Sequence, residues 1–178
     1  MKRLLFATGG MALFTLVAFG CGPRFKAPNL ANGDKVKLDI VIDRNASDPG
    51  LSESQVKQRN QVGDFMENNI VQMAVNAGFE ARAINTREGF KPGQDKYLLI
   101  VKITDYNPGS KAARMLVGFG AGSASLSTHS DLYATLDNAL LSQNHQISSG
   151  RDWTFCVRAL NEETLKAVAE HLSSPGTK

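Results

Sequence analysis

Alternating hydrophobic and polar residues mark the first regular element of the chain. In VKLDIVID (residues 36–43), Leu38, Ile40 and Ile42 occupy every second position, a period of two that predicts a β-strand. The pattern then changes to helical spacing. That spacing predicts a long amphipathic helix whose apolar face carries Val62, Phe65, Met66, Ile70 and Met73.

Local signals mark both ends of this predicted helix. Ser52 and Gln55 have the spacing of a capping box, in which each side chain accepts a hydrogen bond from a free backbone N–H. Gly78 in NAGFE suits the left-handed position that ends a helix, and Phe79 can supply the hydrophobic contact that accompanies such an end. We therefore predict that the helix runs between Ser52 and Gly78.

Four strand-like segments follow. ARAINT (81–86) predicts a short strand, and DKYLLIVKITDY (95–106) is apolar on both faces, as expected of a central strand. SASLSTHSDLYATL (123–136) alternates over its whole length, and LLSQNHQIS (140–148) predicts a weaker strand that pairs with it across a turn.

The last predicted element is a helix, NEETLKAVAEHL (161–172), with Asn161 as its N-cap. The order of strand, helix, four strands and helix indicates an α+β fold. We expect a mainly antiparallel sheet with two helices packed on one face, an α/β sandwich. A chain of 178 residues with 42% hydrophobic content suffices for one core, so residues 36–174 are predicted to form a single domain.

The first twenty residues have the composition of an export signal. A basic start is followed by an uncharged apolar run and then by small residues before Cys21. We predict a signal peptide over residues 1–20 and a flexible tether over residues 21–35. An uncleaved membrane anchor is the alternative, because the apolar run up to Gly20 is near the minimum of about 18 residues for a span.

LVAFGCG (16–22) resembles a bacterial lipoprotein signal, in which a cysteine takes a diacylglycerol and becomes the new N-terminus. Gly20 and Cys21 match that pattern, whereas Phe19 is larger than the usual residue at its position. The resemblance implies lipid attachment at Cys21 and anchoring in a membrane. In that family, Gly22 after the cysteine implies the outer membrane, with the folded domain facing the periplasm.

Glycine occupies three alternate positions in ARMLVGFGAGSAS (113–125), namely Gly118, Gly120 and Gly122. A dinucleotide-binding loop needs a helix after its glycines, and here a strand is predicted instead, so we expect no nucleotide cofactor. Alternate glycines in an extended segment leave one backbone face without side chains, which permits close approach of another element. That element is either part of the same domain or a partner or membrane that contacts Met115, Leu116, Val117 and Phe119.

The surrounding segment (105–138) resembles the core of an uncharacterised family of bacterial envelope lipoproteins with the signature R-x-LVGFGAG-x-A. The resemblance implies an α/β sandwich similar to the periplasmic domain of the curli secretion lipoprotein CsgG. No activity is established for that family, so the resemblance concerns location and fold. The candidate interaction or packing residues are Arg114, Leu116, Val117, Gly118, Phe119, Gly120 and Gly122.

Candidate catalytic residues are few. Ser127, His129 and Asp131 share one face of a predicted strand, but side chains two residues apart do not form the nucleophile–base–orienter geometry of a triad. Cys156 lies in the apolar context WTFCVRAL, which favours a buried, inert thiol over a catalytic one. No His, Cys and carboxylate set has the spacing of metal ligands, and we expect neither a metal nor another cofactor.

Charge argues against a nucleic-acid partner. The formal net charge is +3, and removal of Lys2 and Arg3 with the signal would leave 18 basic against 17 acidic residues. We therefore expect a cell-envelope lipoprotein, not an enzyme, that acts as a binding or assembly module, through a protein partner or self-association. The alternative is an accessory subunit of an envelope export or lipid-transport machine, and an enzyme has the least support.

Overall fold

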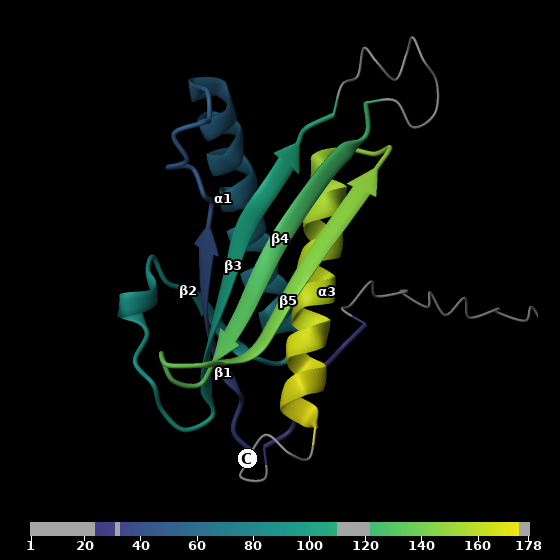
Figure 1. Cartoon of the computed structure of the whole chain (residues 1–178). Coiled ribbons are helices and arrows are strands. Elements are labelled where there is room, and N and C mark those ends of the chain that lie inside the picture. The colour runs from purple at the N-terminus through teal and green to yellow at the C-terminus, as the bar shows by residue number, and fades with distance from the viewer. Residues whose placement is uncertain (1–23, 31–32, 110–121, 175–178) are drawn as a thin grey trace, which may run out of the picture.

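Two layers make up the fold, a five-stranded sheet and two helices on one of its faces (Figure 1). The structure is a computed structural model that describes residues 24–30, 33–109 and 122–174. The strands are β1 (Lys37–Asp43), β2 (Glu80–Ala83), β3 (Lys96–Asn107), β4 (Ala124–Tyr133) and β5 (Ala139–Ser149). The helices are α1 (Glu53–Ala77), the short 3-10 helix η1 (Arg87–Gly89) and α3 (Trp153–Ser173).

The sheet has the strand order β2-β1-β3-β4-β5. Long antiparallel ladders join β3 to β4 and β4 to β5, so the predicted α+β fold with a mostly antiparallel sheet is confirmed. The sheet is mixed, however, because β1 pairs in parallel with both β2 and β3. Helix α1 connects β1 to β2 and serves as the crossover that parallel neighbours require.

Helix α1 begins and ends as its sequence predicts. The Ser52 side chain accepts from the backbone N–H of Gln55, and the Gln55 side chain accepts from the backbone N–H of Ser52, which completes the capping box. At the other end Gly78 has φ 107°, and the Phe79 N–H donates to the Ala74 carbonyl at 3.0 Å. Both ends depend on contacts within one turn of the helix, which is why local sequence predicts them.

Helix α3 begins earlier than predicted. Asp152, not Asn161, is its N-cap, and the Asp152 carboxylate accepts from the Phe155 N–H at 3.2 Å. Apolar residues upstream of Asn161 continue the buried face at helical spacing, so the helix extends toward its N-terminus by two more turns. Asn161 itself is 1% exposed within the helix, and the prediction that it caps the helix is wrong.

Two predicted strands are shorter than the alternation indicates. The 81–86 segment forms a strand only as part of Glu80–Ala83, although the Ile84 N–H still donates to the Ile40 carbonyl at 2.9 Å. The 123–136 segment is a strand only as β4, which ends where its register with β5 shifts between Leu132 and Tyr133. A register irregularity ends regular pairing even where the hydrophobic alternation continues.

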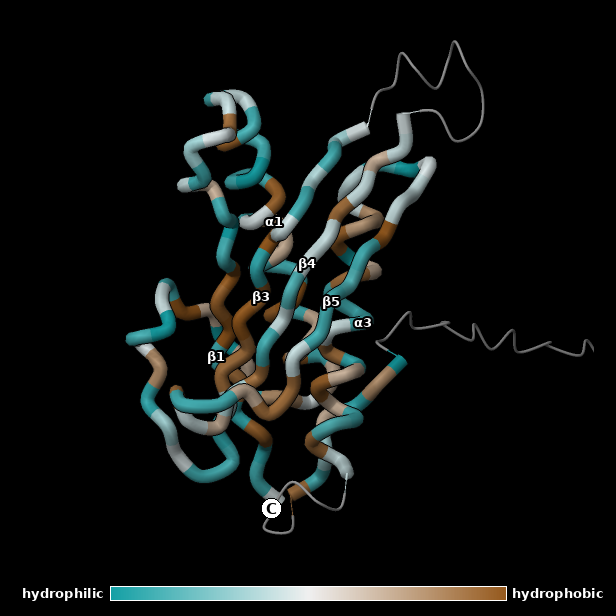
Figure 2. The backbone as a smooth tube through the Cα atoms, viewed as in Figure 1, coloured by the Kyte–Doolittle hydropathy of each residue, from teal (hydrophilic) through white to brown (hydrophobic). Residues whose placement is uncertain are grey.

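The main core lies between the sheet and the two helices. The alternating residues Leu38, Ile40 and Ile42 are buried there, as the first strand predicts, and Met66 and Ile70 of α1 pack against this face. Figure 2 shows the hydrophobic residues concentrated along β1 and β3, in the middle of the sheet.

A smaller hydrophobic cluster lies on the sheet face opposite the helices. It consists of Val41, Phe90, Leu98 and Tyr133, with Phe90 contributed by the segment between β2 and β3. Through Phe90, that segment covers one end of this face of the sheet. The remainder of this face carries polar side chains, and the candidate site lies there.

Candidate functional site

Most of the residues singled out in the sequence lie outside the described residues. These are Cys21, Arg114, Leu116, Val117, Gly118, Phe119 and Gly120. Gly122 is described and lies just before β4. It is in a turn with φ 69°, whereas the alternate-glycine pattern predicts an extended backbone there. The left-handed conformation is one that glycine adopts without strain.

A close backbone approach does occur beside Gly122, but at a residue that the sequence analysis missed. A Cβ atom on Gly109 would lie 2.8 Å from the backbone nitrogen of Ala124 and 2.9 Å from the carbonyl carbon of Ser123. Gly109 also has φ 74°. The signal in the sequence is the Pro108-Gly109 dipeptide, which marks a turn after a strand.

The exposed part of the sheet face is formed by β3, β4 and β5. Side chains alternate along β4, so that Ala124 and Leu126 face the helices while Ser125 and Ser127 face the opposite side. The register places uncharged polar residues of β5 beside them, with Gln146 opposite Ser127. We call this surface, made by the outward-facing residues of β3, β4 and β5, the polar face.

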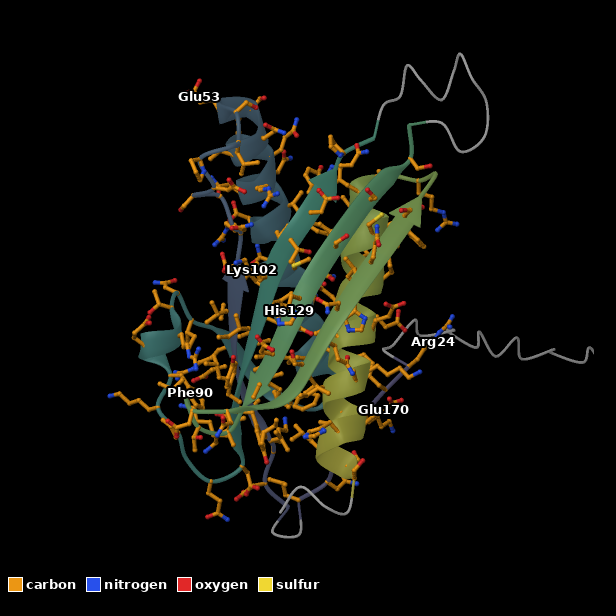
Figure 3. The ribbon with its side chains drawn as sticks, in the orientation of Figure 1. Arg24, Glu53, Phe90, Lys102, His129 and Glu170 are labelled. Atoms are coloured by element: carbon orange, nitrogen blue, oxygen red, sulfur yellow. The ribbon has the colours of Figure 1, made fainter. Side chains whose placement is uncertain are left out.

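His129 lies at the centre of the polar face (Figure 3). Its Nδ1 atom is 2.9 Å from Oδ1 of Asn144, the residue directly opposite on β5. Its Nε2 atom is 3.2 Å from a carboxylate oxygen of Asp131 and 3.4 Å from Oγ of Ser142. Both nitrogens of the imidazole thus have polar neighbours on the surface of the sheet.

This arrangement differs from a catalytic triad. In a triad the acid contacts one imidazole nitrogen and the nucleophilic hydroxyl contacts the other. Here Asp131 and Ser142 both approach Nε2 of His129, while an amide oxygen of Asn144 occupies the other side. The geometry fixes the orientation of the His129 ring within a network of polar side chains on the surface of the sheet.

A cleft of about 410 Å³ continues the polar face toward β1. Val41 and Ile100 line it from the sheet. Asp43, the last residue of β1, and Arg44, which follows it, line another side. Asp43 also connects the cleft to the polar face, since its carboxylate is 4.0 Å from Nζ of Lys102, the β3 residue opposite His129. Figure 3 shows Lys102 on the β1 side of the labelled His129.

A charged cluster of Asp39, Arg82 and Lys96 connects β1 to its parallel neighbours β2 and β3. The Asp39 side chain is 3% exposed and accepts from Arg82 Nε at 2.7 Å, with Nζ of Lys96 at 3.1 Å from its other oxygen. Burial alone would raise the pKa of Asp39, but the hydrogen bonds and charges of Arg82 and Lys96 outweigh it and lower the pKa. Because β1 lies between β2 and β3, this cluster stabilises the strand order.

Two further groups of possible chemical interest are held in unreactive states. Cys156 is fully buried, as predicted, and its Sγ lies 3.6 Å from the Ala124 carbonyl oxygen. Burial raises the pKa of the Cys156 thiol, which favours the protonated, weakly nucleophilic form. Burial likewise raises the pKa of Tyr106 to about 12, so its hydroxyl stays protonated at neutral pH.

The described ranges contain no group of three His, Cys, Asp or Glu side chains placed to hold a metal ion. None of the helices in those ranges is both long enough and apolar enough to cross a membrane. His145, on the helix side of β5, contacts Glu163 at 3.4 Å and Gln143 at 3.1 Å. The polar face and its adjoining cleft are therefore the candidate site in the part of the chain that the structure describes.

Comparison with solved structures found distant similarity. A dodecamer of PelC from Paraburkholderia phytofirmans has 13% identity over 79% of this chain and 92% of that chain, with a TM-score of 0.48. A putative neuraminyllactose-binding hemagglutinin homolog from Helicobacter pylori has 9% identity over 86% of this chain and 92% of that chain, with a TM-score of 0.26. At these values the similarities carry no functional argument.

Comparison with curated proteins found no match. The sequence profile of a domain of unknown function, DUF4410, covers the whole folded region, from residue 24 to residue 172. The chain therefore belongs to the DUF4410 family, a domain of unknown function.

Proposed function

We propose that this protein is a cell-envelope lipoprotein whose folded domain acts as a binding or assembly module. The export-like segment before Cys21 supports the location. Of the residues predicted as a tether, Phe25 is buried in the main core and the Ala27 N–H donates to the Ala77 carbonyl at 2.8 Å, so this part packs on the domain. The observation that carries the second part is the polar face, where His129 has a polar neighbour at each ring nitrogen in a geometry unlike a triad. Such a surface offers oriented hydrogen-bonding groups to a partner.

The anchoring is tested by intact-mass measurement of the protein purified from membranes. We expect a chain that begins at Cys21 and carries lipid, and we expect Cys21→Ser to release the protein from the membrane fraction. Cys156→Ser is the matched control, because that thiol is buried and lipid attachment should not depend on it. An uncleaved N-terminus would support a membrane anchor instead, and a soluble chain without lipid would support ordinary signal cleavage.

The binding role is tested with charges on the polar face. Ser125→Arg/Ser127→Arg places two bulky cations on the outward side of β4 without altering the side that packs on the helices. We expect this variant to remain folded and lipid-anchored but to lose its crosslinked products with other proteins in native membranes. Unchanged crosslinking would reject the polar face as the binding surface. Co-purification with inner-membrane transport proteins would favour an accessory role in export or lipid transport.

A further inference from the structure

Strand β5 forms one edge of the sheet. It pairs with β4 from Ala139 to Ser149, and in the described part of the chain no strand pairs with its other side. An edge strand presents a row of backbone N–H and C=O groups that can pair with another chain. The length of the strand matters here, because the nine residues from Leu141 to Ser149 pair with β4 in one unbroken register.

Beyond the irregularity at Leu140, the β5 edge carries no charge or proline that would prevent edge-to-edge pairing. Its sequence, ALLSQNHQISS, contains no proline and no Lys, Arg, Asp or Glu. The opposite edge, β2, is only four residues long and carries Glu80 and Arg82. Natural sheets block their edges with short strands, charges, proline or bulges. The β2 edge is short and charged, whereas the irregularity of β5 is confined to its start and leaves Leu141 to Ser149 open.

The residues of β5 are also complementary to a second copy of the same strand. If two β5 strands run antiparallel and are centred on Asn144, the regular residues from Leu141 to Ile147 all find a partner. In that register Leu141 lies opposite Ile147, and both of these pack against the main core from the helix side of the sheet. On the polar face, Ser142 lies opposite Gln146. Each pair then joins side chains of the same character on the same face.

We propose that two copies of this chain associate through antiparallel pairing of their β5 strands around Asn144. The pairing would join two five-stranded sheets into one continuous sheet, with both polar faces on one side and all four long helices on the other. This inference rests on the assembly role proposed above and adds self-association through the β5 edge to binding at the polar face. The partner is a second copy because an antiparallel two-fold contact uses the same surface on both chains and ends with a dimer. The strand also carries no Lys, Arg, Asp or Glu that would select a partner of opposite charge.

Single cysteines test the register in the full-length protein in native membranes. Only Asn144 lies opposite itself in the proposed pairing, so Asn144→Cys should form an intermolecular disulfide on mild oxidation. Ser148→Cys is the matched control on the same face of β5, within the regular part of the strand. Its two copies would be eight residues out of register, or about 26 Å apart, and should not crosslink. Equal crosslinking at both positions, or none at Asn144→Cys beyond the wild-type background, would overturn the proposal.

Paired charges provide an independent test. In the proposed register, position 142 of each copy lies opposite position 146 of the other. Ser142→Lys/Gln146→Lys therefore places two lysines opposite each other at two symmetric points of the interface. We expect the dimer dissociation constant in detergent solution to rise by about tenfold. Ser142→Lys/Gln146→Glu introduces charges at the same sites but pairs opposite signs, and should remain dimeric. Equal dissociation of the two variants, or a monomeric wild-type protein, would contradict pairing in this register.

Membrane fractionation separates failure of this inference from failure of the anchoring. The charge variants should stay in the membrane fraction because lipid attachment does not involve β5. A protein that is anchored but monomeric in sedimentation experiments would refute only the β5 pairing. Loss of dimers in Cys21→Ser alone, with intact dimers in the wild type, would show that association depends on the membrane and not on the β5 edge, which would also refute it.

Discussion

Asn161, buried in the middle of α3, donates a hydrogen bond of 3.1 Å to the backbone carbonyl of Met66 in the middle of α1. The same amide nitrogen lies 2.9 Å from Oδ1 of Asn69, one turn further along α1. A single side chain thus connects the two helices by hydrogen bonds within the buried core. Because an amide in such a place needs its partners, it fixes which residues of the two helices face each other.

We expect Asn161→Ala to reduce the free energy of unfolding by about 1–3 kcal/mol, because it leaves the Asn69 side chain without this partner and opens space between the helices. The measurement is urea denaturation followed by circular dichroism. Asn76→Ala is the matched control, since Asn76 is an exposed residue of α1, and it should change stability by less than about 0.5 kcal/mol. Similar effects of the two substitutions would argue against the inter-helix role.

Thr128 provides a case in which removal of a polar group should stabilise the protein. The residue is 1% exposed on the helix side of β4, and its hydroxyl has no hydrogen-bond partner among the described residues. Thr128→Val replaces that hydroxyl with a methyl group of similar size. We therefore expect the free energy of unfolding, measured by thermal denaturation, to rise by about 1 kcal/mol. Thr128→Ser keeps the hydroxyl and loses the methyl, and should be destabilised. A loss of stability in Thr128→Val would mean that the hydroxyl is bonded in solution.

Gly109 lies just after β3, against the main chain that leads into β4. A Cβ atom there would meet the main chain of Ser123 and Ala124, which cannot move aside as a flexible side chain would, and the residue also has φ 74°. We expect Gly109→Ala to cost about 1–3 kcal/mol of stability. Gly150→Ala is the control, because a Cβ at Gly150 meets no atom within 4 Å. Equal melting temperatures of the two variants would show that position 109 tolerates a side chain.

The Asp39 cluster makes part of the stability depend on acid pH. The pKa of Asp39 is lowered in the folded state from 3.8, so the unfolded state takes up protons first as pH falls. The contribution of Asp39 is therefore present above pH 3.8 and is lost as pH falls through the lower, folded-state pKa.

We expect Asp39→Asn to be less stable than wild type at pH 7 by about 1–3 kcal/mol, because Arg82 and Lys96 lose a charged acceptor. The difference between the two proteins should narrow as pH falls below 3.8 in urea denaturation experiments. Asp137→Asn, at an exposed position, serves as the control. A difference that is the same at all pH values would show that packing, not charge, accounts for the loss.

The elements that could be predicted from sequence are those whose causes are local. Alternation in β1 and the two ends of α1 follow from contacts within a few residues, such as the capping pair of Ser52 and Gln55. The class of fold follows from the order of these elements. Gly109 also had a local signal in the Pro108-Gly109 dipeptide, but its close approach to Ala124 joins residues that are distant in sequence and has no local signal.

The tertiary structure decided the features that depend on which distant residues become neighbours. Asn161 has a side chain suited to an N-cap, and only the packing of α3 on α1 turns it into a buried link to Met66. The parallel pairing of β1 arises from the crossover path of α1, which brings Arg82 to Asp39 from 43 residues away. Likewise, only the β4–β5 register places Asn144 beside His129. Alternation assigns a residue to a face of a strand, whereas the partner it meets there is determined by topology and register.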